Sequence, residues 1–198
     1  MTSMAGRVHP YGSGRDALLD AAVKVVARVG LRGLTYRAVA TEAGVTNSLV
    51  AHHFGSRDAL ITETLRRSVQ RSIETSRLID FAASEPEFRK ALLDVVDSEP
   101  EQQAFQFELI LEARRRPELR EPVRELYRTY IATLQAGLGA ANPALADEAQ
   151  ARTVFAALDG LMLQFLSGLP RSEVEASITA LWALLAVRPT SADDGAPR

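Results

Sequence analysis

Cysteine is absent from this chain of 198 residues, and only 3 histidines are present. Disulfides and thiolate metal sites are therefore excluded, and the absence agrees with a reducing compartment. The sequence also lacks a recognisable Ser-His-Asp arrangement and a glycine-rich loop of the kind that holds phosphate. We therefore expect no enzyme activity, no metal site and no cofactor.

Long apolar runs are missing as well. No run reaches the ~18 residues that a membrane span requires, and the longest candidate, residues 153–169, is interrupted by Asp159. Residues 1–12 contain no apolar segment of the kind found in signal peptides. We expect a cytoplasmic protein with no membrane partner, in which residues 1–12 and the Pro-, Gly- and Asp-containing residues 189–198 are flexible ends.

Charge is distributed unevenly along the chain. Residues 1–80 contain 11 Lys and Arg and 7 Asp and Glu, whereas residues 81–198 contain 12 and 18, so the front carries +4 and the rear −6. A basic front favours a polyanionic partner for that part alone, although a solvated surface explains so mild a bias equally well.

Strand patterns are almost missing, because alternation of β-branched and aromatic residues is not sustained anywhere. Periods near 3.6 residues recur instead and predict an all-α fold. In the front part, helices are expected over residues 14–29, 36–43, 47–54 and 57–83. In the rear part, helices are expected over residues 86–98, 101–116, 117–139, 142–169 and 172–188.

Two of the front helices form a helix-turn-helix pattern. Thr35 is a suitable N-cap for the helix over 36–43, and Gly44 is expected to end it in a left-handed conformation. Thr46 is the expected N-cap of the helix over 47–54, and Val45 is expected to fill the angle between the two helices. The turn between them is tight and contains glycine, as helix-turn-helix units require.

The second helix of such a unit enters the major groove of DNA and presents its first residues to base edges. Asn pairs well with adenine, and Ser and Thr reach bases or phosphates. Val50 and Phe54 are expected to face the core. The residues predicted to contact DNA are Thr35, Tyr36, Arg37, Thr46, Asn47, Ser48, His52, His53 and Arg57.

The adjacent histidines, His52 and His53, point about 100° apart on a helix, so they do not share a metal. We assign His53, and less firmly His52, to the DNA backbone; the alternative is that both are surface imidazoles without a role. Arg57 is expected to meet phosphate, Tyr36 to donate its hydroxyl to phosphate, and Arg37 to reach a base or a phosphate.

Residues 15–61, which include "LTYRAVATEAGVTNSLVAHHFGSRDAL", resemble the DNA-binding segment of the TetR family of transcriptional repressors in order and spacing. The resemblance places Arg37, His53 and Arg57 at positions that contact DNA in the family, and it places Asn47 and Ser48 at the start of the recognition helix. Ala51 departs from the pattern, because the family usually has a phosphate-contacting Tyr there.

The resemblance implies two domains: a DNA-binding domain over residues 13–73 and a helical effector-binding and dimerisation domain over 74–188. It also implies a homodimer formed by the last two long helices. The sequence supports this independently, since residues 153–166 are apolar on nearly all sides, although a buried core helix is the alternative. The residues predicted at the dimer interface are Phe155, Leu158, Leu161, Phe165, Leu181, Leu184 and Leu185.

The ligand is poorly specified by the sequence. The residues predicted to line an apolar cavity are Phe105, Leu109, Tyr127, Tyr130, Phe155, Asp159 and Met162, although most of them are equally suited to an ordinary core. Glu108, Glu112, Gln135 and Asp159 are the candidate polar anchors. For Asp159 the alternative is a helix–helix contact beside Gly160.

The expected function is a regulator that binds a double-stranded DNA operator as a homodimer and is released from it by an apolar or amphipathic small molecule. The alternative is a dimeric helical protein that binds small molecules and has weak or lost DNA binding, as the departure at Ala51 allows.

Overall fold

The computed structural model describes residues 13–76 and 85–186, and this part of the chain is helical without strands. The first four helices are α1 (Ser13–Val29), α2 (Tyr36–Ala43), α3 (Asn47–Phe54) and α4 (Arg57–Ser76), with a short 3-10 helix, η1 (Leu31–Gly33), after α1. The remaining α-helices are α5 (Glu85–Ser98), α6 (Pro100–Glu112), α7 (Arg120–Ala141), α8 (Glu148–Leu166) and α9 (Arg171–Ala186). The all-α prediction is confirmed.

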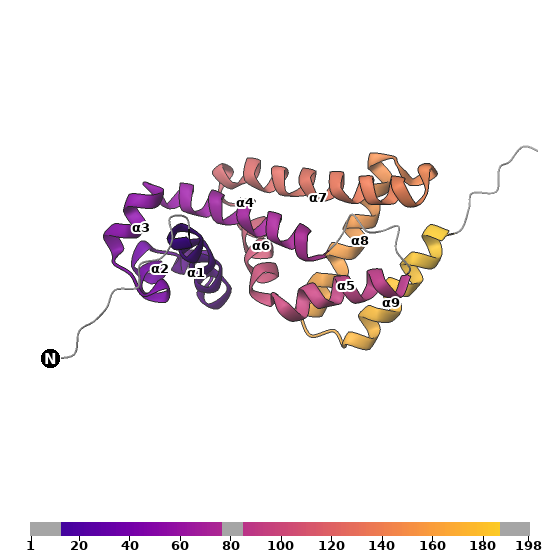
Figure 1. Ribbon diagram of the computed structural model, residues 1–198, viewed down its shortest axis with the longest axis horizontal. Helices are drawn as coiled ribbons and strands as arrows, with labels where there is room; N and C mark the ends of the chain where they lie inside the picture. The colour runs from indigo at the N-terminus through magenta and orange to yellow at the C-terminus, as the bar shows by residue number, and fades with distance from the viewer. Residues whose placement is uncertain (1–12, 77–84, 187–198) are drawn as a thin grey trace, which may run out of the picture.

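The helices form an elongated molecule with a small bundle at one end (Figure 1). Helices α1, α2 and α3 gather at that end, and α4 leads from it into the rest of the molecule, with α7 running alongside. Helix α1 also packs on α6, so the first bundle rests directly on the second group of helices. The core is continuous across this boundary, from Leu18 of α1 to Leu109 of α6, both of which are fully buried.

The predicted helix boundaries hold closely in the first bundle and less well behind it. The helix expected over 101–116 ends at Glu112, and residues 113–115 form a turn before Pro117. A separate 3-10 helix, η3 (Pro117–Leu119), then precedes α7.

The helix expected over 142–169 likewise begins later, after the 3-10 helix η4 (Pro143–Leu145), where Asp147 caps α8 by accepting from the amides of Ala149 and Gln150. Residues 77–83 of the long helix expected after Ser56, and both predicted flexible ends, lie outside the described residues. Within residues 13–76 and 85–186, no helix is long and apolar enough to cross a membrane.

Candidate functional site

The N-cap of α2 and the glycine that ends it have the geometry that the sequence predicts. The Thr35 hydroxyl accepts a hydrogen bond from the amide of Ala38 at 3.1 Å. Gly44 has a φ of 69°, a left-handed conformation that costs glycine little, and its amide donates back to the carbonyl of Ala40. The turn therefore fixes α3 at a set angle to α2, with one face of α3 left outward.

Helix α3 divides sharply into a buried and an exposed side. Val50 is fully buried and Phe54 is 6% exposed, as predicted, whereas Thr46, Asn47, Ser48 and His52 are exposed at and beyond the start of the helix. The side chain of Thr46 makes no cap bond to the backbone; its hydroxyl lies 3.1 Å from that of Ser48. The first turn thus presents hydroxyls and an amide side chain to solvent.

Two apolar residues on the same surface were not predicted there. Leu49 and Val45 are each 37% exposed, so Val45 does not fill the angle between the helices. Exposed apolar side chains beside a polar helix start are suited to contact the methyl group of thymine. The sequence contains no signal for Leu49, because successive helix residues are about 100° apart and Leu49 is therefore equally far from the exposed Ser48 and the buried Val50.

The predicted cations and histidines are placed differently from one another. Arg37 is exposed, and no ion pair or hydrogen bond within the described residues engages its guanidinium. His52 is exposed and His53 is half-buried, with the ring centroids 5.8 Å apart. His53 also contacts the ring of Phe54, so His52 is the more accessible imidazole.

Two of the predicted phosphate contacts do not fit the structure. The hydroxyl of Tyr36 is buried and has no hydrogen-bond partner in the described part of the chain, so it is not available to phosphate. The guanidinium of Arg57 turns inward, where Nε donates to the carbonyl of Leu34 at 2.7 Å and a terminal nitrogen donates to that of Leu31 at 2.5 Å. Arg57 therefore stabilises the bundle through these bonds, and the hydroxyl of Tyr36 does not lie on its outer surface.

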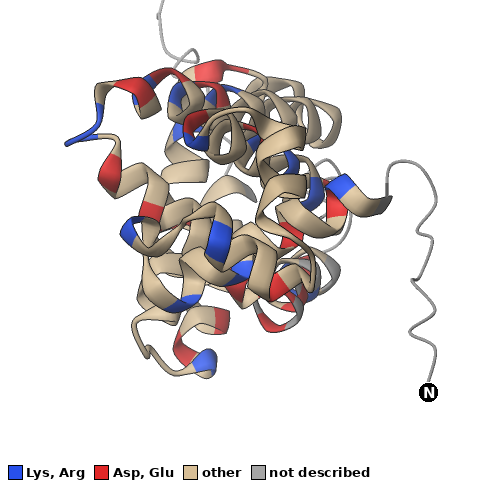
Figure 2. Ribbon diagram, turned by 90° about the vertical axis from the view of Figure 1, so that its left-hand side faces the viewer, with Lys and Arg blue, Asp and Glu red and all other residues tan. Residues whose placement is uncertain are grey.

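The basic bias of the front half does not form one patch. Figure 2 views the molecule from the end that holds α2 and α3, and its blue and red segments are interspersed over the ribbon. Several of these cations are paired, such as Arg28 with Glu42 at 2.9 Å. Helix α3 itself carries no Lys, Arg, Asp or Glu, so its exposed face is polar but uncharged when its histidines are neutral.

A second cluster of functional groups lies between α7 and α8. The ring of Phe155 stacks on that of Tyr130, with centroids 5.1 Å apart, and meets the edge of Tyr127 at 6.0 Å. The Tyr127 hydroxyl donates to the half-buried carboxylate of Asp159 at 3.5 Å. Burial raises the pKa of Asp159, and burial together with the charge of Asp159 raises the pKa of Tyr127 to about 12.

Beside these rings lies a buried polar network that the sequence reasoning missed. Gln106 of α6 donates from Nε2 to the hydroxyls of Ser68 and Ser72 on α4, at 2.9 and 3.0 Å. The hydroxyl of Tyr130 donates to Oε1 of Gln106 at 2.9 Å. A signal existed: Ser68 and Ser72 continue the apolar helical register of α4, where polar residues would otherwise be out of place.

The other predicted ligand residues serve different purposes. Phe105 and Leu109 are fully buried and Met162 is 6% exposed, so all three belong to the continuous core. The carboxylate of Glu112 pairs with Arg115, and Nε2 of Gln135 donates to the carbonyl of Ala146.

The carboxylate of Glu108, another candidate polar anchor, is bonded away from the aromatic cluster. Its Oε1 accepts from the amide of Leu31 at 3.0 Å, which joins α6 to the turn that follows α1. Of the candidate polar anchors, Asp159 alone is placed beside the aromatic cluster.

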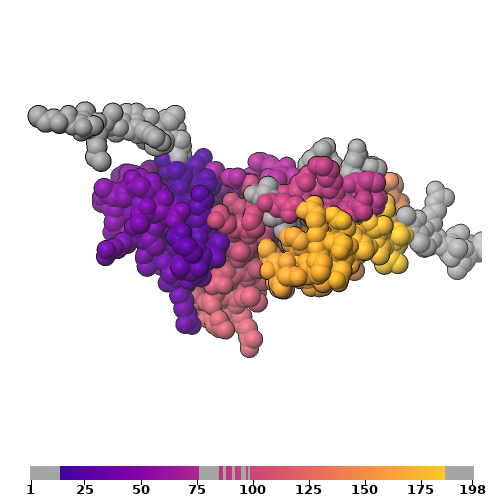
Figure 3. All heavy atoms as spheres, turned by 90° about the horizontal axis from the view of Figure 1, so that it is seen from below, coloured from indigo at the N-terminus to yellow at the C-terminus, as the bar shows by residue number. Residues whose placement is uncertain are grey.

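The outer face of α8 and α9 remains partly apolar. From below, the orange and yellow atoms of these helices form one continuous surface (Figure 3). Leu184 is 72% exposed and Leu163 is 46% exposed, whereas Leu161, Phe165, Leu181 and Leu185 are half-buried.

Two residues predicted at the dimer interface are instead part of the protomer core. Phe155 is 9% exposed and Leu158 is 2% exposed, because both face the other helices of the same chain. Leu163 was missed as a surface residue, since an almost uniformly apolar helix gives no indication of which side is inward.

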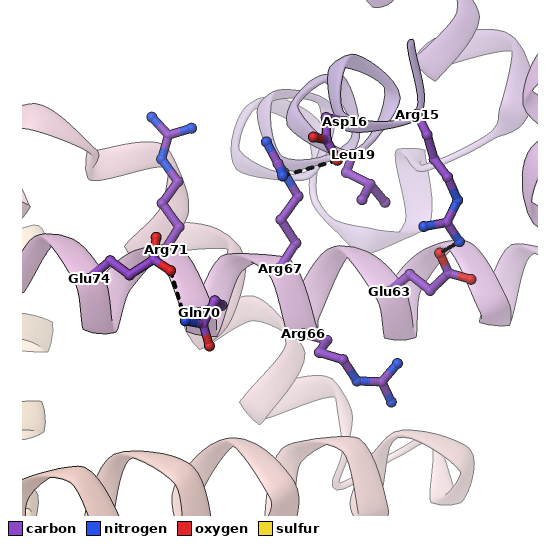
Figure 4. A pocket seen from close by; sticks show the side chains of 9 residues that line it. All are labelled: Arg15, Asp16, Leu19, Glu63, Arg66, Arg67, Gln70, Arg71 and Glu74. Atoms are coloured by element: carbon purple, nitrogen blue, oxygen red, sulfur yellow. Dashed lines mark hydrogen bonds and ion pairs between the residues drawn. The ribbon is translucent and has the colours of Figure 1, made fainter. Parts of the chain in front are cut away.

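Ion pairs join α1 to α4 along a charged groove of about 850 Å³ (Figure 4). Arg15 pairs with Glu63 near one end. Arg67 pairs with Asp16 at 3.0 Å and with Asp20 at 3.3 Å. Together with the bond from Glu108 to Leu31, these contacts hold α1 between α4 and α6.

Comparisons with known proteins agree with this arrangement. The model of bacterial regulatory proteins of the tetR family matches residues 18–64, and that of the tetracyclin repressor-like C-terminal domain matches residues 83–184. The HTH-type transcriptional regulator BetI of Rhizobium meliloti is 32% identical over 170 residues, which cover 83% of each chain.

Two solved structures are similarly related. A member of the TetR family from Streptomyces coelicolor A3 is 30% identical, with a TM-score of 0.68 over 85% of this chain and 97% of that one. The multidrug binding protein EbrR, complexed with imidazole, is 30% identical, with a TM-score of 0.65 over 89% of this chain and 97% of that one. The chain therefore belongs to the TetR family of DNA-binding transcription regulators.

Proposed function

We propose that this protein is a repressor that binds its operator as a homodimer and releases it when a small molecule binds between α7 and α8. The observation that supports DNA reading is the exposed start of α3, where Thr46, Asn47 and Ser48 face solvent while Val50 and Phe54 anchor the helix. Asn47 and Ser48 have the side chains that discriminate bases, and Arg37 is an exposed cation that can meet a base or phosphate.

The partly apolar face of α8 and α9 supports the proposed dimer. Leu184 and Leu163 are exposed on adjacent helices, and burying them against a second copy stabilises the pair. Two recognition helices must then lie about 34 Å apart to meet successive half-sites on one side of the duplex.

The ligand region is the cluster of Tyr127, Tyr130, Phe155 and Asp159. Aromatic faces and a half-buried carboxylate favour a flat ligand that carries positive charge or hydrogen-bond donors. The related EbrR was solved with imidazole and with proflavin, which are both aromatic molecules. Gln106 lies next to this cluster, only two positions before Glu108 on α6, so movement of α6 would reach the bond from Glu108 to Leu31 of the DNA-binding domain.

The test is a gel-shift titration with the DNA upstream of the protein's own gene. Asn47→Ala combined with Arg37→Ala should weaken binding at least about tenfold, since each base or charged contact contributes about 1–3 kcal/mol. The control is Arg152→Ala, which removes an exposed cation that pairs with Glu148 on α8. Equal binding by the double variant and the control would refute the assignment of α3.

The alternative, a ligand-binding dimer that has lost DNA binding, is favoured by the small Ala51 in α3. A salt series separates the two functions. Specific phosphate contacts give an affinity that falls steeply and linearly on logarithmic axes as salt rises. The absence of any saturable binding at 50 mM salt would favour the alternative.

A further inference from the structure

Helix α3 lies at one end of the molecule, and the two residues that anchor it show which side of it faces outward (Figure 1). Val50 is fully buried and Phe54 is 6% exposed, so together they mark the inward direction. Successive helix residues are about 100° apart, so His52 points about 180° from that direction, and Ser48 and Leu49 lie about 40° and about 60° from His52. All three side chains are exposed. We call Ser48, Leu49 and His52 the outward ridge of α3.

The outward ridge combines two polar side chains with an apolar one. Ser48 has a hydroxyl and His52 an imidazole, and both groups can form hydrogen bonds. The side chain of Leu49, which is 37% exposed, can form none. Its backbone amide donates to the carbonyl of Thr46 at 3.1 Å in the first turn of the helix, so the place of the leucine on the ridge is well defined. Val45 is equally exposed, but it precedes the helix.

The major groove of DNA offers a leucine side chain one suitable surface. Base edges there display hydrogen-bond donors and acceptors, and the apolar group among them is the C5-methyl of thymine. A leucine placed on any other base edge removes water from polar groups without replacing the lost hydrogen bonds, which is unfavourable. A leucine placed on the methyl group buries apolar surface on both sides of the contact. The chemistry of Leu49 therefore favours thymine at the base pair that it meets.

We propose that Leu49 is a specificity-determining residue, which selects a thymine in each half-site of the operator by packing on its C5-methyl group. This inference rests on the proposed function, in which α3 reads DNA, and adds to it a base preference that needs no hydrogen bond. Because the homodimer presents two copies of α3, the thymine is expected at symmetric positions of the two half-sites. Because the contact is uncharged, its contribution should not depend on salt.

The experiment compares thymine with uracil, which lacks only the C5-methyl group. The full-length protein first selects its preferred duplex from a pool of random sequences. Each symmetric pair of thymines in that duplex is then replaced by uracil in gel-shift titrations, and one pair is expected to respond. Loss of one buried methyl group should weaken binding about fourfold in one half-site and about tenfold or more in both. The ratio of the two affinities should stay constant between about 50 and 200 mM salt, while both affinities fall.

Variants of Leu49 test whether this residue is the partner of the methyl group. Leu49→Ala should bind the thymine and uracil duplexes within about twofold of each other, because the packing partner is removed. Leu49→Met keeps an apolar side chain of similar volume and should retain most of the difference. Alanine favours helix at least as well as leucine, so Leu49→Ala should stay folded, which thermal unfolding checks. The matched control is Leu111→Ala, which removes a leucine of α6 that is 65% exposed and should leave the full difference.

Two results would overturn the inference. One is that uracil weakens binding at no pair of thymines. The other is that Leu49→Ala keeps the full difference between thymine and uracil, which would assign the methyl contact to another residue. Both results leave the repressor function standing, since Asn47 and Ser48 can select the duplex through hydrogen bonds. A pool that yields no preferred sequence would instead refute the proposed function and the inference together.

Discussion

One experiment can distinguish a structural role for Arg57, which its hydrogen bonds in the structure indicate, from the DNA contact that was predicted for it. Its side chain donates to the carbonyls of Leu34 and Leu31, in the turn that connects α1 to α2. Leu31 and Leu34 are 1% and 0% exposed, so the turn is part of the core of the DNA-binding bundle. Removing the guanidinium therefore leaves backbone acceptors with fewer donors in a region that water reaches poorly.

The expected loss in the free energy of unfolding follows from the two hydrogen bonds of Arg57. A hydrogen bond to a charged group contributes about 1.5–3 kcal/mol. The Leu31 carbonyl keeps a longer bond from the amide of Leu34 at 3.2 Å, which compensates in part. We expect Arg57→Ala to lower the free energy of unfolding by about 2–4 kcal/mol. For a chain of this length, this corresponds to a fall of roughly 5–15 °C in Tm.

The assay is thermal unfolding followed by circular dichroism, together with operator titration at a temperature where the variant is folded. The Tm of Arg57→Lys should lie between those of Arg57→Ala and the unaltered protein, because an ammonium lacks the planar fork with which the guanidinium reaches two carbonyls. Arg37→Ala is the matched control, since Arg37 is exposed, and it should weaken DNA binding with little change in Tm. A Tm for Arg57→Ala within about 2 °C of the original, combined with lost DNA affinity, would refute the reasoning.

The remaining predictions concern other parts of the molecule. Glu108→Ala should lower the free energy of unfolding by about 1–2 kcal/mol in denaturant titrations, because it removes the acceptor of the Leu31 amide, whereas Glu108→Gln, which keeps an acceptor oxygen, should cost less. Leu184→Glu should shift the protein from dimer to monomer in sedimentation analysis without altering its circular dichroism, and an unchanged dimer would place the interface elsewhere. Burial raises the pKa of both Tyr127 and Tyr130 to about 12, so absorbance at 295 nm should show two tyrosines ionising late, and Tyr127→Phe should remove one of them. Since both folded-state pKa values lie above the unfolded value of about 10, the stability they contribute is present below pH 10 and should be lost as the pH rises from about 10 to 12.

The sequence was most informative where local rules decide the structure. The cap at Thr35, the left-handed Gly44 and the buried pair Val50 and Phe54 follow from short-range chemistry, and all are confirmed. These elements also carry the family resemblance, so the position of α3 could be predicted without coordinates.

The sequence-based predictions were wrong where several partners are possible for a side chain and the packing of the helices decides between them. Tyr36 and Arg57 have polar ends suited to phosphate, but their inward contacts depend on how three helices meet. Phe155 and Leu158 were assigned to the wrong side of α8, because a helix that is apolar all round does not show which face is internal. Gln106 was missed because its partners, Ser68 and Ser72, are distant in sequence and become visible only when α4 and α6 are packed together.

The contacts of Gln106 have a consequence for selectivity. Its amide already makes hydrogen bonds to two serine hydroxyls and to Tyr130, so the polar groups next to the aromatic cluster satisfy one another without a ligand. A ligand that enters must replace each hydrogen bond that it breaks. A purely apolar ligand would leave these buried groups without partners, at a cost of about 1–3 kcal/mol for each group. The region is thus expected to exclude purely apolar compounds of the right size and to admit compounds that can both donate and accept hydrogen bonds.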